Sequence, residues 1–420
     1  MNRSILFVPL AFTLIAAAAP PARHPDGVAD AALRATPVFD GHNDVPEQLR
    51  DRRKDVLEGF DFHDTRNTGD ETKGVPPMMT DLARMRNGRV GAQFWSVYVS
   101  ANLPEPQAVQ ATLEQIDVMR RLIARYPADM QFCTDARCVE ASWKAGRIAS
   151  LIGMEGGHSI GGSLAVLRQM HALGARYMTL THFRNTAWAD SATDAPSHDG
   201  LTPFGEKVVR EMHRLGMLVD LAHVSEATMR DVLTLEGPPP MVSHSNARAI
   251  NGHARNVSDD TLRLIGTRGG IVMVNFYPPY VMEAARQWSA SREAEVARLK
   301  ALHRGAPEVE TAALAKWDKA NPMPRGSIAD VADHLDHIAR LIGADHVGLG
   351  GDLDGVDATI AGLDDVSCYP ALFSELARRG WSQADLEKLS SRNMLRVMRE
   401  AEGFAQAHRA DAPLENETTF

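Results

Sequence analysis

Eight short apolar segments recur along this chain of 420 residues, and segments with helical periodicity separate most of them. Most of the apolar segments are rich in Val, Ile, Leu or Met, which is typical of buried parallel strands. Because strand and helix alternate, the sequence predicts an α/β fold on a parallel sheet, and eight strands suit one (β/α)8 TIM-type barrel. The predicted strands are residues 37–44, 90–100, 149–157, 175–182, 218–223, 240–246, 269–276 and 346–355.

Six helices are expected between the strands, and two more are expected after the last strand. Ser225 and Ser258 stand at N-cap positions, where a hydroxyl can accept a hydrogen bond from the backbone of the first turn. The final two segments, residues 370–379 and 382–400, are expected to pack across one end of the barrel. The helices predicted between strands are residues 107–126, 162–173, 204–215, 225–235, 258–265 and 328–342.

The two ends of the chain are expected to lie outside the barrel. Arg3 precedes an apolar run over residues 5–19, which is shorter than the roughly 20 residues of a transmembrane helix and is typical of a cleaved signal peptide. No later run is long enough to span a membrane, so we expect an exported protein, periplasmic or secreted, without a stable membrane anchor. The expected organisation is a signal peptide over 1–19, an N-terminal linker over 20–36, one barrel over 37–403 and a polar tail over 404–420.

Charge and cysteine content exclude two classes of protein. Lysine and arginine total 45 against 54 acidic residues, for a net charge of −9 without a basic stripe, which argues against nucleic acid as a partner. The chain has 3 cysteines, which are too few for a disulfide scaffold. Cys133 and Cys138 could bridge in an oxidising compartment or remain free thiols, because the sequence does not set the geometry that a disulfide needs.

Two connections are long enough to hold insertions. Residues 45–89 separate the first and second strands, and residues 277–345 place a charged helical stretch between the seventh and eighth. Loops on the active face of a barrel usually shape or cover the substrate cavity. The second insertion is equally well explained as a solvated charged helix without a functional role.

Polar side chains lie at the ends of six predicted strands. The carboxyl ends of the strands of a parallel barrel meet at one rim, where barrel enzymes assemble their catalytic groups. This repeated position therefore predicts an active site. The residues are His42, Asp44, Glu155, His182, His223, His244 and Asp352.

Several of these side chains are suited to metal binding. His42 and Asp44 are two residues apart at a strand end, so they face the same side and can bind one ion together. A buried carboxylate such as Glu155 needs a cation or several donors, although an arginine partner would also suffice. His223 and His244 end consecutive strands, which lie about 4.8 Å apart in a sheet, and can converge on a second ion, although each alone fits a hydrogen-bonded core position. Together these residues predict a two-metal centre, for which zinc suits the nitrogen and oxygen ligands and manganese or cobalt could substitute.

Seven short motifs occur in order between about Pro37 and Glu400. They are Asp40-Gly41-His42-Asn43-Asp44, Gly153-Met154-Glu155-Gly156-Gly157, Leu180-Thr181-His182, Asp220-Leu221-Ala222-His223-Val224-Ser225, Ser243-His244-Ser245, Arg255-Asn256-Val257 and Gly350-Gly351-Asp352-Leu353-Asp354-Gly355. This set resembles the renal (membrane) dipeptidase family of zinc peptidases. The resemblance implies a TIM-type barrel of the metal-dependent hydrolase kind, with loop insertions and closing C-terminal helices.

By that resemblance, two zinc ions per subunit would bind at the strand ends, and a hydroxide bridging them would attack the peptide bond of a dipeptide. His42 and Asp44 would hold one ion. His223 and His244 would hold the other, and Glu155 would bridge the two.

The same resemblance assigns three residues to the substrate. His182 would stabilise the oxyanion that develops on the scissile carbonyl. Arg255 would pair with the free C-terminal carboxylate, which suits its forked guanidinium. Asp352 would take a proton from the water and give it to the leaving amine. Without the metal cluster, these three would be interpreted as a core histidine, a surface ion pair and a turn residue.

The chain departs from animal members of the family beside His182, where Phe183 and Arg184 replace Ser and Cys, so the specificity there and any membrane attachment are left open. Phe183, Arg184 and Trp188 could line the pocket, and Trp188 fits core packing equally well. The same metal site could act on N-acyl amino acids, lactams or other amides, or the chain could be a binding protein that has lost catalysis. Members of the family often form homodimers, which the resemblance extends to this chain as an expectation.

Overall fold

Nine strands form one sheet in the computed structural model, which describes residues 24–70, 72 and 74–416. All strand pairs are parallel, and the order is β2-β1-β9-β8-β7-β6-β5-β4-β3. Because β2 also pairs with β4, the sheet closes into a barrel of eight strands, and β3 pairs with β4 alone. The strands are β1 Val38–Asn43, β2 Val90–Tyr98, β3 Met130–Phe132, β4 Ile148–Glu155, β5 Ala175–Thr179, β6 Leu218–Asp220, β7 Met241–Val242, β8 Ile271–Val274 and β9 Val347–Leu349.

The predicted (β/α)8 barrel is confirmed, although several strands end earlier than predicted. The strand predicted over 218–223 ends at Asp220, and the strand predicted over 346–355 ends at Leu349. His223 and Asp352 have φ values of 63° and 59°, a left-handed conformation that ends an extended strand. Strand β3 was not predicted, because three residues carry too little pattern to identify a strand.

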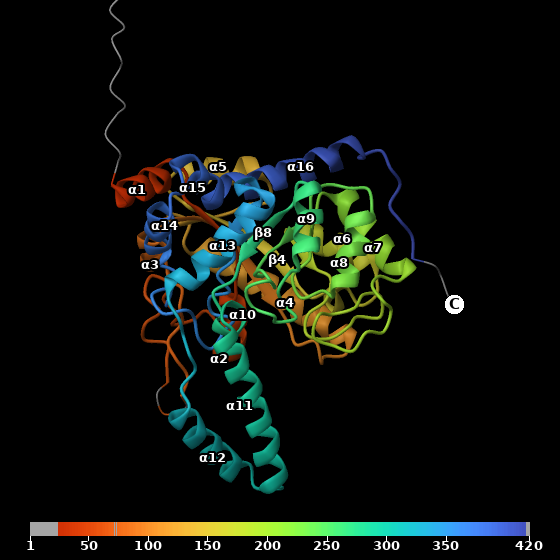
Figure 1. Ribbon diagram of the computed structural model, residues 1–420. Helices are drawn as coiled ribbons and strands as arrows, with labels where there is room; N and C mark the ends of the chain where they lie inside the picture. Colours follow the sequence, from red (N-terminus) through yellow and green to blue (C-terminus); the bar gives the residue numbers. More distant parts are fainter. Residues whose placement is uncertain (1–23, 71, 73, 417–420) are drawn as a thin grey trace, which may run out of the picture.

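Helices follow most strands and cover the barrel (Figure 1). The predicted N-caps are confirmed, since the Ser225 and Ser258 hydroxyls accept hydrogen bonds from the backbone N–H groups of Thr228 and Thr261. Short 3₁₀ turns cover Gly157–Ile160 and Ala344–His346, and a π segment covers Lys388–Arg392. The helices are α1 Pro25–Ala35, α2 Val45–Arg53, α3 Leu82–Asn87, α4 Glu105–Arg125, α5 Ala136–Lys144, α6 Leu164–Leu173, α7 Pro203–Leu215, α8 Glu226–Thr234, α9 Asp259–Thr267, α10 Pro278–Val281, α11 Glu283–Leu302, α12 Pro307–Ala320, α13 Ile328–Ile342, α14 Tyr369–Arg378, α15 Gln383–Glu387 and α16 Asn393–Ala407.

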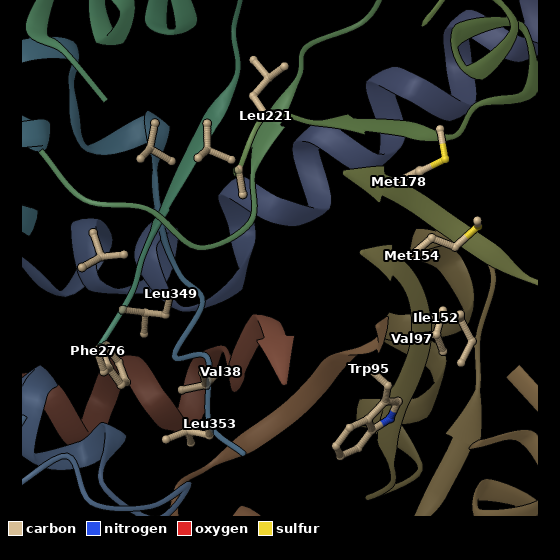
Figure 2. Packing of buried hydrophobic residues seen from close by; sticks show 14 of the residues in the cluster. Val38, Trp95, Val97, Ile152, Met154, Met178, Leu221, Phe276, Leu349 and Leu353 are labelled. Carbon is tan, nitrogen blue, oxygen red and sulfur yellow. The ribbon is translucent and has the colours of Figure 1, made fainter. Parts of the chain in front are cut away.

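The strand side chains divide between two apolar layers. Phe94 on β2 packs inside the barrel against Phe39 and Tyr177, whose ring centroids lie 5.5 and 4.9 Å from its own. Trp95 and Val97 belong to the outer layer between strands and helices, part of which Figure 2 shows. Successive side chains of a strand point to opposite faces, so each strand contributes side chains to both layers. The barrel interior is therefore a packed core.

Helix α16 and the π segment before it close the end of the barrel at which the strands begin. They contact β1, β8 and β9. Met394 and Met398 share an apolar cluster with Met241 and Ile271, which start β7 and β8. The closure predicted for residues 382–400 is confirmed. Helix α14, also expected at this end, instead packs beside the barrel against α1 and α13.

Helices extend into both terminal segments that were expected to lie outside the barrel. Within the predicted linker, α1 buries Ala29, Ala32 and Leu33 and contacts α14 and α15. Its apolar face consists mostly of alanines, which gave too weak a periodicity to predict a helix. Helix α16 continues to Ala407, into the predicted polar tail. The predicted signal peptide, residues 1–19, lies outside the described residues.

The insertion between β8 and β9 forms α10 to α13, and α11 and α12 extend away from the barrel as a hairpin (Figure 1). Trp288 packs against Trp317 with ring centroids 6.0 Å apart, and Arg292 Nε lies 2.8 Å from Asp318 Oδ1. The charged helix expected here is thus a pair of helices that contact each other more than the barrel. Within the described part of the chain, no helix combines the length and the apolar character that a membrane span requires.

Cys133 and Cys138 form a disulfide that joins the end of β3 to the first turn of α5. This bridge settles the alternative that the sequence left open. Cys368 is a free thiol just before α14.

Candidate metal centre and substrate cavity

The predicted site residues gather at the rim where the barrel strands end. His42 lies within β1, and Glu155 is the last residue of β4. The other predicted rim side chains lie in loops rather than at strand ends, because a loop can turn a side chain back over the barrel where an extended strand would point it in or out. His182, His223, His244 and Asp352 follow β5, β6, β7 and β9 in this way.

Glu155 lies at the centre of the group. Its Oε1 is 3.0 Å from His223 Nε2 and 3.5 Å from the Nε2 atoms of both His182 and His244. Its Oε2 is 3.4 Å from His42 Nε2. One buried carboxylate thus faces four imidazoles from four different segments.

Asp44 and Asp352 extend the group beside His42. Asp44 Oδ2 lies 3.4 Å from His42 Nε2, and Asp352 Oδ1 lies 3.9 Å from the same atom. His42 Nε2 and both carboxylate oxygens of Asp44 are buried, and no described residue forms a hydrogen bond with them. Buried polar atoms are normally satisfied, so these atoms fit the donor set of a bound cation.

The described residues include three sets of side chains that could hold a metal ion. Within each set, the potential ligand atoms lie within 4.8 Å of one another. Glu155 and His42 each belong to two sets, so shared ligands join the sets into one centre. Imidazole nitrogen and carboxylate oxygen without thiolate suit zinc, with manganese or cobalt as alternatives. The sets are His42 with Glu155 and His244, Glu155 with His182 and His223, and His42 with Asp44 and Asp352.

Two of the histidines favour the neutral form that binds metals. Burial, and then the positive charge of Arg255, lower the pKa of His223 well below its ordinary value. Burial also lowers the pKa of His244 well below its ordinary value, together with His42 and Arg255. A neutral imidazole keeps a lone pair for a cation, so these side chains suit ligation at neutral pH.

Hydrogen bonds on the far side of two imidazoles fix their orientation. His42 Nδ1 lies 2.9 Å from the Tyr177 hydroxyl. His244 Nδ1 lies 2.8 Å from the Ser243 hydroxyl, which donates to Asp220 Oδ2 at 2.6 Å. Because the Ser243 proton goes to Asp220, its oxygen accepts from His244 Nδ1–H, which leaves the Nε2 lone pair facing Glu155.

A cavity of about 660 Å³ opens over this group and includes Arg255 in its wall. The Arg255 side chain is buried, donates to Ser245 Oγ at 3.2 Å and to the His244 carbonyl at 3.3 Å, and lies 5.3 Å from the ring centroid of Tyr280. Among the described residues, no carboxylate pairs with Arg255. A buried guanidinium without a counter-charge at a cavity wall is suited to bind a carboxylate from a ligand.

His182 and Asp352 also line the cavity. The His182 ring packs between Tyr98 and Phe183, with centroid distances of 4.4 and 4.1 Å. Asn275 Nδ2 donates to Asp352 Oδ2 at 2.8 Å. Burial raises the pKa of Asp352 well above its ordinary value, and the nearby carboxylates add to this effect.

Of the pocket residues that the sequence left open, only Phe183 lines the cavity. Trp188 is 1% exposed and packs in the core against Phe204, so its core interpretation is confirmed. Arg184 Nε instead donates to Asn102 Oδ1 at 3.1 Å.

Several wall residues were not predicted from the sequence. Glu47 follows the His42-Asn43-Asp44 motif within the first turn of α2, and Tyr98 ends β2. In the sequence, these two residues are marked as cavity candidates only by their position next to a motif or at a strand end. Tyr280 lies in the short helix α10 and His253 in a loop after β7, and neither position carries a motif in the sequence.

Comparisons with known proteins identify the family of this chain. A family model described as membrane dipeptidase, peptidase family M19, matches residues 28–412. Dipeptidase 3 of Macaca fascicularis is 40% identical over 397 residues, which cover 93% of this chain and 70% of that protein. Dipeptidase 3 of Homo sapiens is 38% identical over 399 residues, covering 94% of this chain and 71% of that protein.

Two solved structures share the fold. The probable dipeptidase PvdM from Pseudomonas aeruginosa matches with a TM-score of 0.76 at 23% identity, covering 91% of this chain and 99% of that one. A metallopeptidase from Rhodobacter sphaeroides, liganded with a phosphinate mimic of the dipeptide L-Ala-D-Ala, matches with a TM-score of 0.69 at 24% identity, covering 87% and 99%. Because the family model covers most of the chain, the chain belongs to the membrane dipeptidase family, peptidase family M19, and is a metallo-dipeptidase.

Proposed function

We propose that this metallo-dipeptidase hydrolyses its substrate with two zinc ions held by His42, Asp44, Glu155, His223 and His244. The observation that carries the proposal is the central position of Glu155, whose two oxygens face imidazoles on both sides. A carboxylate so placed can bridge two cations. Bound zinc would lower the pKa of the hydrolytic water and polarise the scissile carbonyl.

The chain's own residues would divide the remaining work. Arg255 binds the C-terminal carboxylate of the dipeptide, which places the peptide bond over the centre. His182 Nε2 donates to the carbonyl oxygen as negative charge develops there. Asp352 takes a proton from the attacking water and passes it to the leaving amine. Its proximity to His42 and its hydrogen bond from Asn275 support this position.

The Glu155→Gln variant tests the proposal directly. We expect it to lose zinc, measured by elemental analysis, and to lose hydrolysis of a panel of L,L and L,D dipeptides. Glu402→Gln is a suitable control, because Glu402 accepts from the Ala136 backbone at the opposite end of the barrel. Full activity in Glu155→Gln would contradict the bridging role.

Arg255→Met tests the carboxylate site separately. One charged hydrogen-bonding partner contributes roughly 1.5–3 kcal/mol, so kcat/KM for dipeptides with a free carboxylate should fall about ten- to hundredfold. Dipeptide amides, which lack that charge, should be affected little. If both substrates lose activity equally, Arg255 does not recognise the carboxylate. Good turnover of N-acyl amino acids or lactams by the wild type, with poor turnover of dipeptides, would instead favour the alternative substrate class.

We also propose that the chain is exported. Arg3 and the apolar run over residues 5–19 support a signal peptide, and the Cys133–Cys138 disulfide is typical of an oxidising compartment. The mature protein recovered from periplasm or medium should lack these residues by N-terminal sequencing. An unprocessed protein confined to the cytoplasm would contradict export.

A further inference from the structure

Glu47 is a half-buried carboxylate in the cavity wall that the proposed mechanism does not use. It lies in the first turn of α2, directly after β1 and the cage residue Asp44. Its side chain lines the same cavity as Arg255 and Tyr98. Among the described residues, no hydrogen-bond donor and no cationic side chain pairs with Glu47.

The surroundings of Glu47 are negative. Burial and the neighbouring carboxylates of Asp44, Glu155 and Asp51 raise the pKa of Glu47 to about 9. Metal ions would neutralise Asp44 and Glu155, which belong to the ligand sets, whereas Glu47 belongs to none of those sets. Glu47 is thus left without a resident counter-charge, and a positive group on the ligand could supply one.

Glu47 and Arg255 belong to different segments of the rim. Glu47 follows β1, and Arg255 follows β7, with β9 and β8 between those two strands in the barrel. A dipeptide whose carboxylate binds Arg255 and whose peptide bond lies over the metal centre extends its N-terminal residue away from Arg255, across the centre to which Asp44, at the start of the helix that holds Glu47, belongs. The exposed carboxylates of Glu293 and Asp357 line the same cavity and extend its negative charge.

We propose that Glu47 binds a cationic nitrogen on the N-terminal residue of the substrate and so selects dipeptides that are positively charged at that end. This inference rests on the proposed dipeptide hydrolysis. Two groups on a dipeptide carry such a cationic nitrogen, namely the free α-ammonium of any dipeptide and the side chain of an N-terminal lysine or arginine. N-acylated and acidic N-terminal residues are disfavoured in either case.

Four substrates distinguish the two groups in wild type and in Glu47→Gln. Ala-Ala and N-acetyl-Ala-Ala differ in the α-ammonium, whereas Lys-Ala and norleucyl-Ala differ in the side-chain cation. We expect Glu47→Gln to reduce the kcat/KM ratio of at least one pair by roughly tenfold, as loss of one charge-assisted hydrogen bond implies. The pair that responds identifies the nitrogen that Glu47 binds.

Glu58→Gln is the matched control, because Glu58 is an exposed carboxylate in the loop after the same helix that does not line the cavity. It should leave both ratios unchanged, and zinc content should stay constant in both variants. If Glu47→Gln leaves both ratios unchanged, or lowers kcat/KM of all four substrates equally, Glu47 does not set this specificity. If the wild type cleaves none of the four, the proposed dipeptide hydrolysis itself fails.

Discussion

The two ends of the barrel bury different kinds of side chain. At the end where the strands begin, the apolar side chains of α16 pack against those of the strands, among them Met394 and Met241. At the end where the strands finish, buried carboxylates and imidazoles lie within hydrogen-bonding reach of one another, and several of their atoms have no hydrogen-bond partner within the described part of the chain. Apolar burial stabilises the fold, whereas unpartnered polar burial costs free energy unless a ligand compensates it. The end where the strands begin therefore stabilises the fold, and the end where they finish is suited to binding.

Metal removal is expected to have the largest effect, because it should abolish activity at the end where the strands finish and leave the fold of the barrel intact. Chelation should abolish dipeptide hydrolysis, because the water-activating charge is lost, while far-ultraviolet circular dichroism should still report a folded barrel. Adding zinc back should restore activity. Persistent activity in metal-free protein, verified by elemental analysis, would break the assignment of the rim as a metal centre.

Shortening an apolar side chain at the end where the strands begin should lower stability and leave activity unchanged. Met394 is 1% exposed, so Met394→Ala should lower the free energy of unfolding by about 2–5 kcal/mol through lost burial and a new cavity. The kcat/KM of the folded fraction should not change. Denaturant titration and steady-state kinetics measure the two quantities, and a large loss of kcat/KM at unchanged stability would contradict the division of roles.

Removing a hydrogen bond that orients a proposed metal ligand should have an intermediate effect. Ser243→Ala takes away the hydrogen bond to His244 Nδ1, and Tyr177→Phe takes away the one to His42 Nδ1. Loss of such an orienting partner typically weakens metal binding by about ten- to hundredfold. Competition with a chromogenic chelator gives the zinc affinity. Val97→Ala on the outer layer serves as a control that alters packing without touching a ligand.

Breaking a surface ion pair at the closed end should have the smallest effect. Arg399 pairs with Glu140 while both side chains are largely exposed, at 51% and 38%. Exposed pairs contribute about 0–1 kcal/mol, so Arg399→Ala should change the free energy of unfolding by less than about 1 kcal/mol and leave kcat/KM unaltered. A thermal-unfolding comparison at low and high salt checks this. A larger effect would show that charge also matters at this end.

Much of the architecture could be predicted because local pattern and global fold agree. The eight barrel strands and six interleaved helices, α4, α6, α7, α8, α9 and α13, appear as apolar runs and helical periods, and Ser225 and Ser258 cap helices as their positions indicate. Helices α1, α2, α3, α5 and α10 and strand β3 were not predicted, because they are short or weakly patterned and depend on contacts with distant elements. The same dependence explains why α14 packs against α1 rather than across the barrel end.

For the site, the sequence by itself determined which residues are available and that parallel strands bring them to one rim. Tertiary structure decided the rest, because distances between loops depend on how each backbone turns after its strand. It brought His223 Nε2 to 3.0 Å from Glu155 Oε1, left Arg255 buried without a carboxylate partner among the described residues, and closed the Cys133–Cys138 bridge. It also placed Glu47 in the cavity wall, where a helix-start glutamate is half-buried without a cationic partner among the described residues.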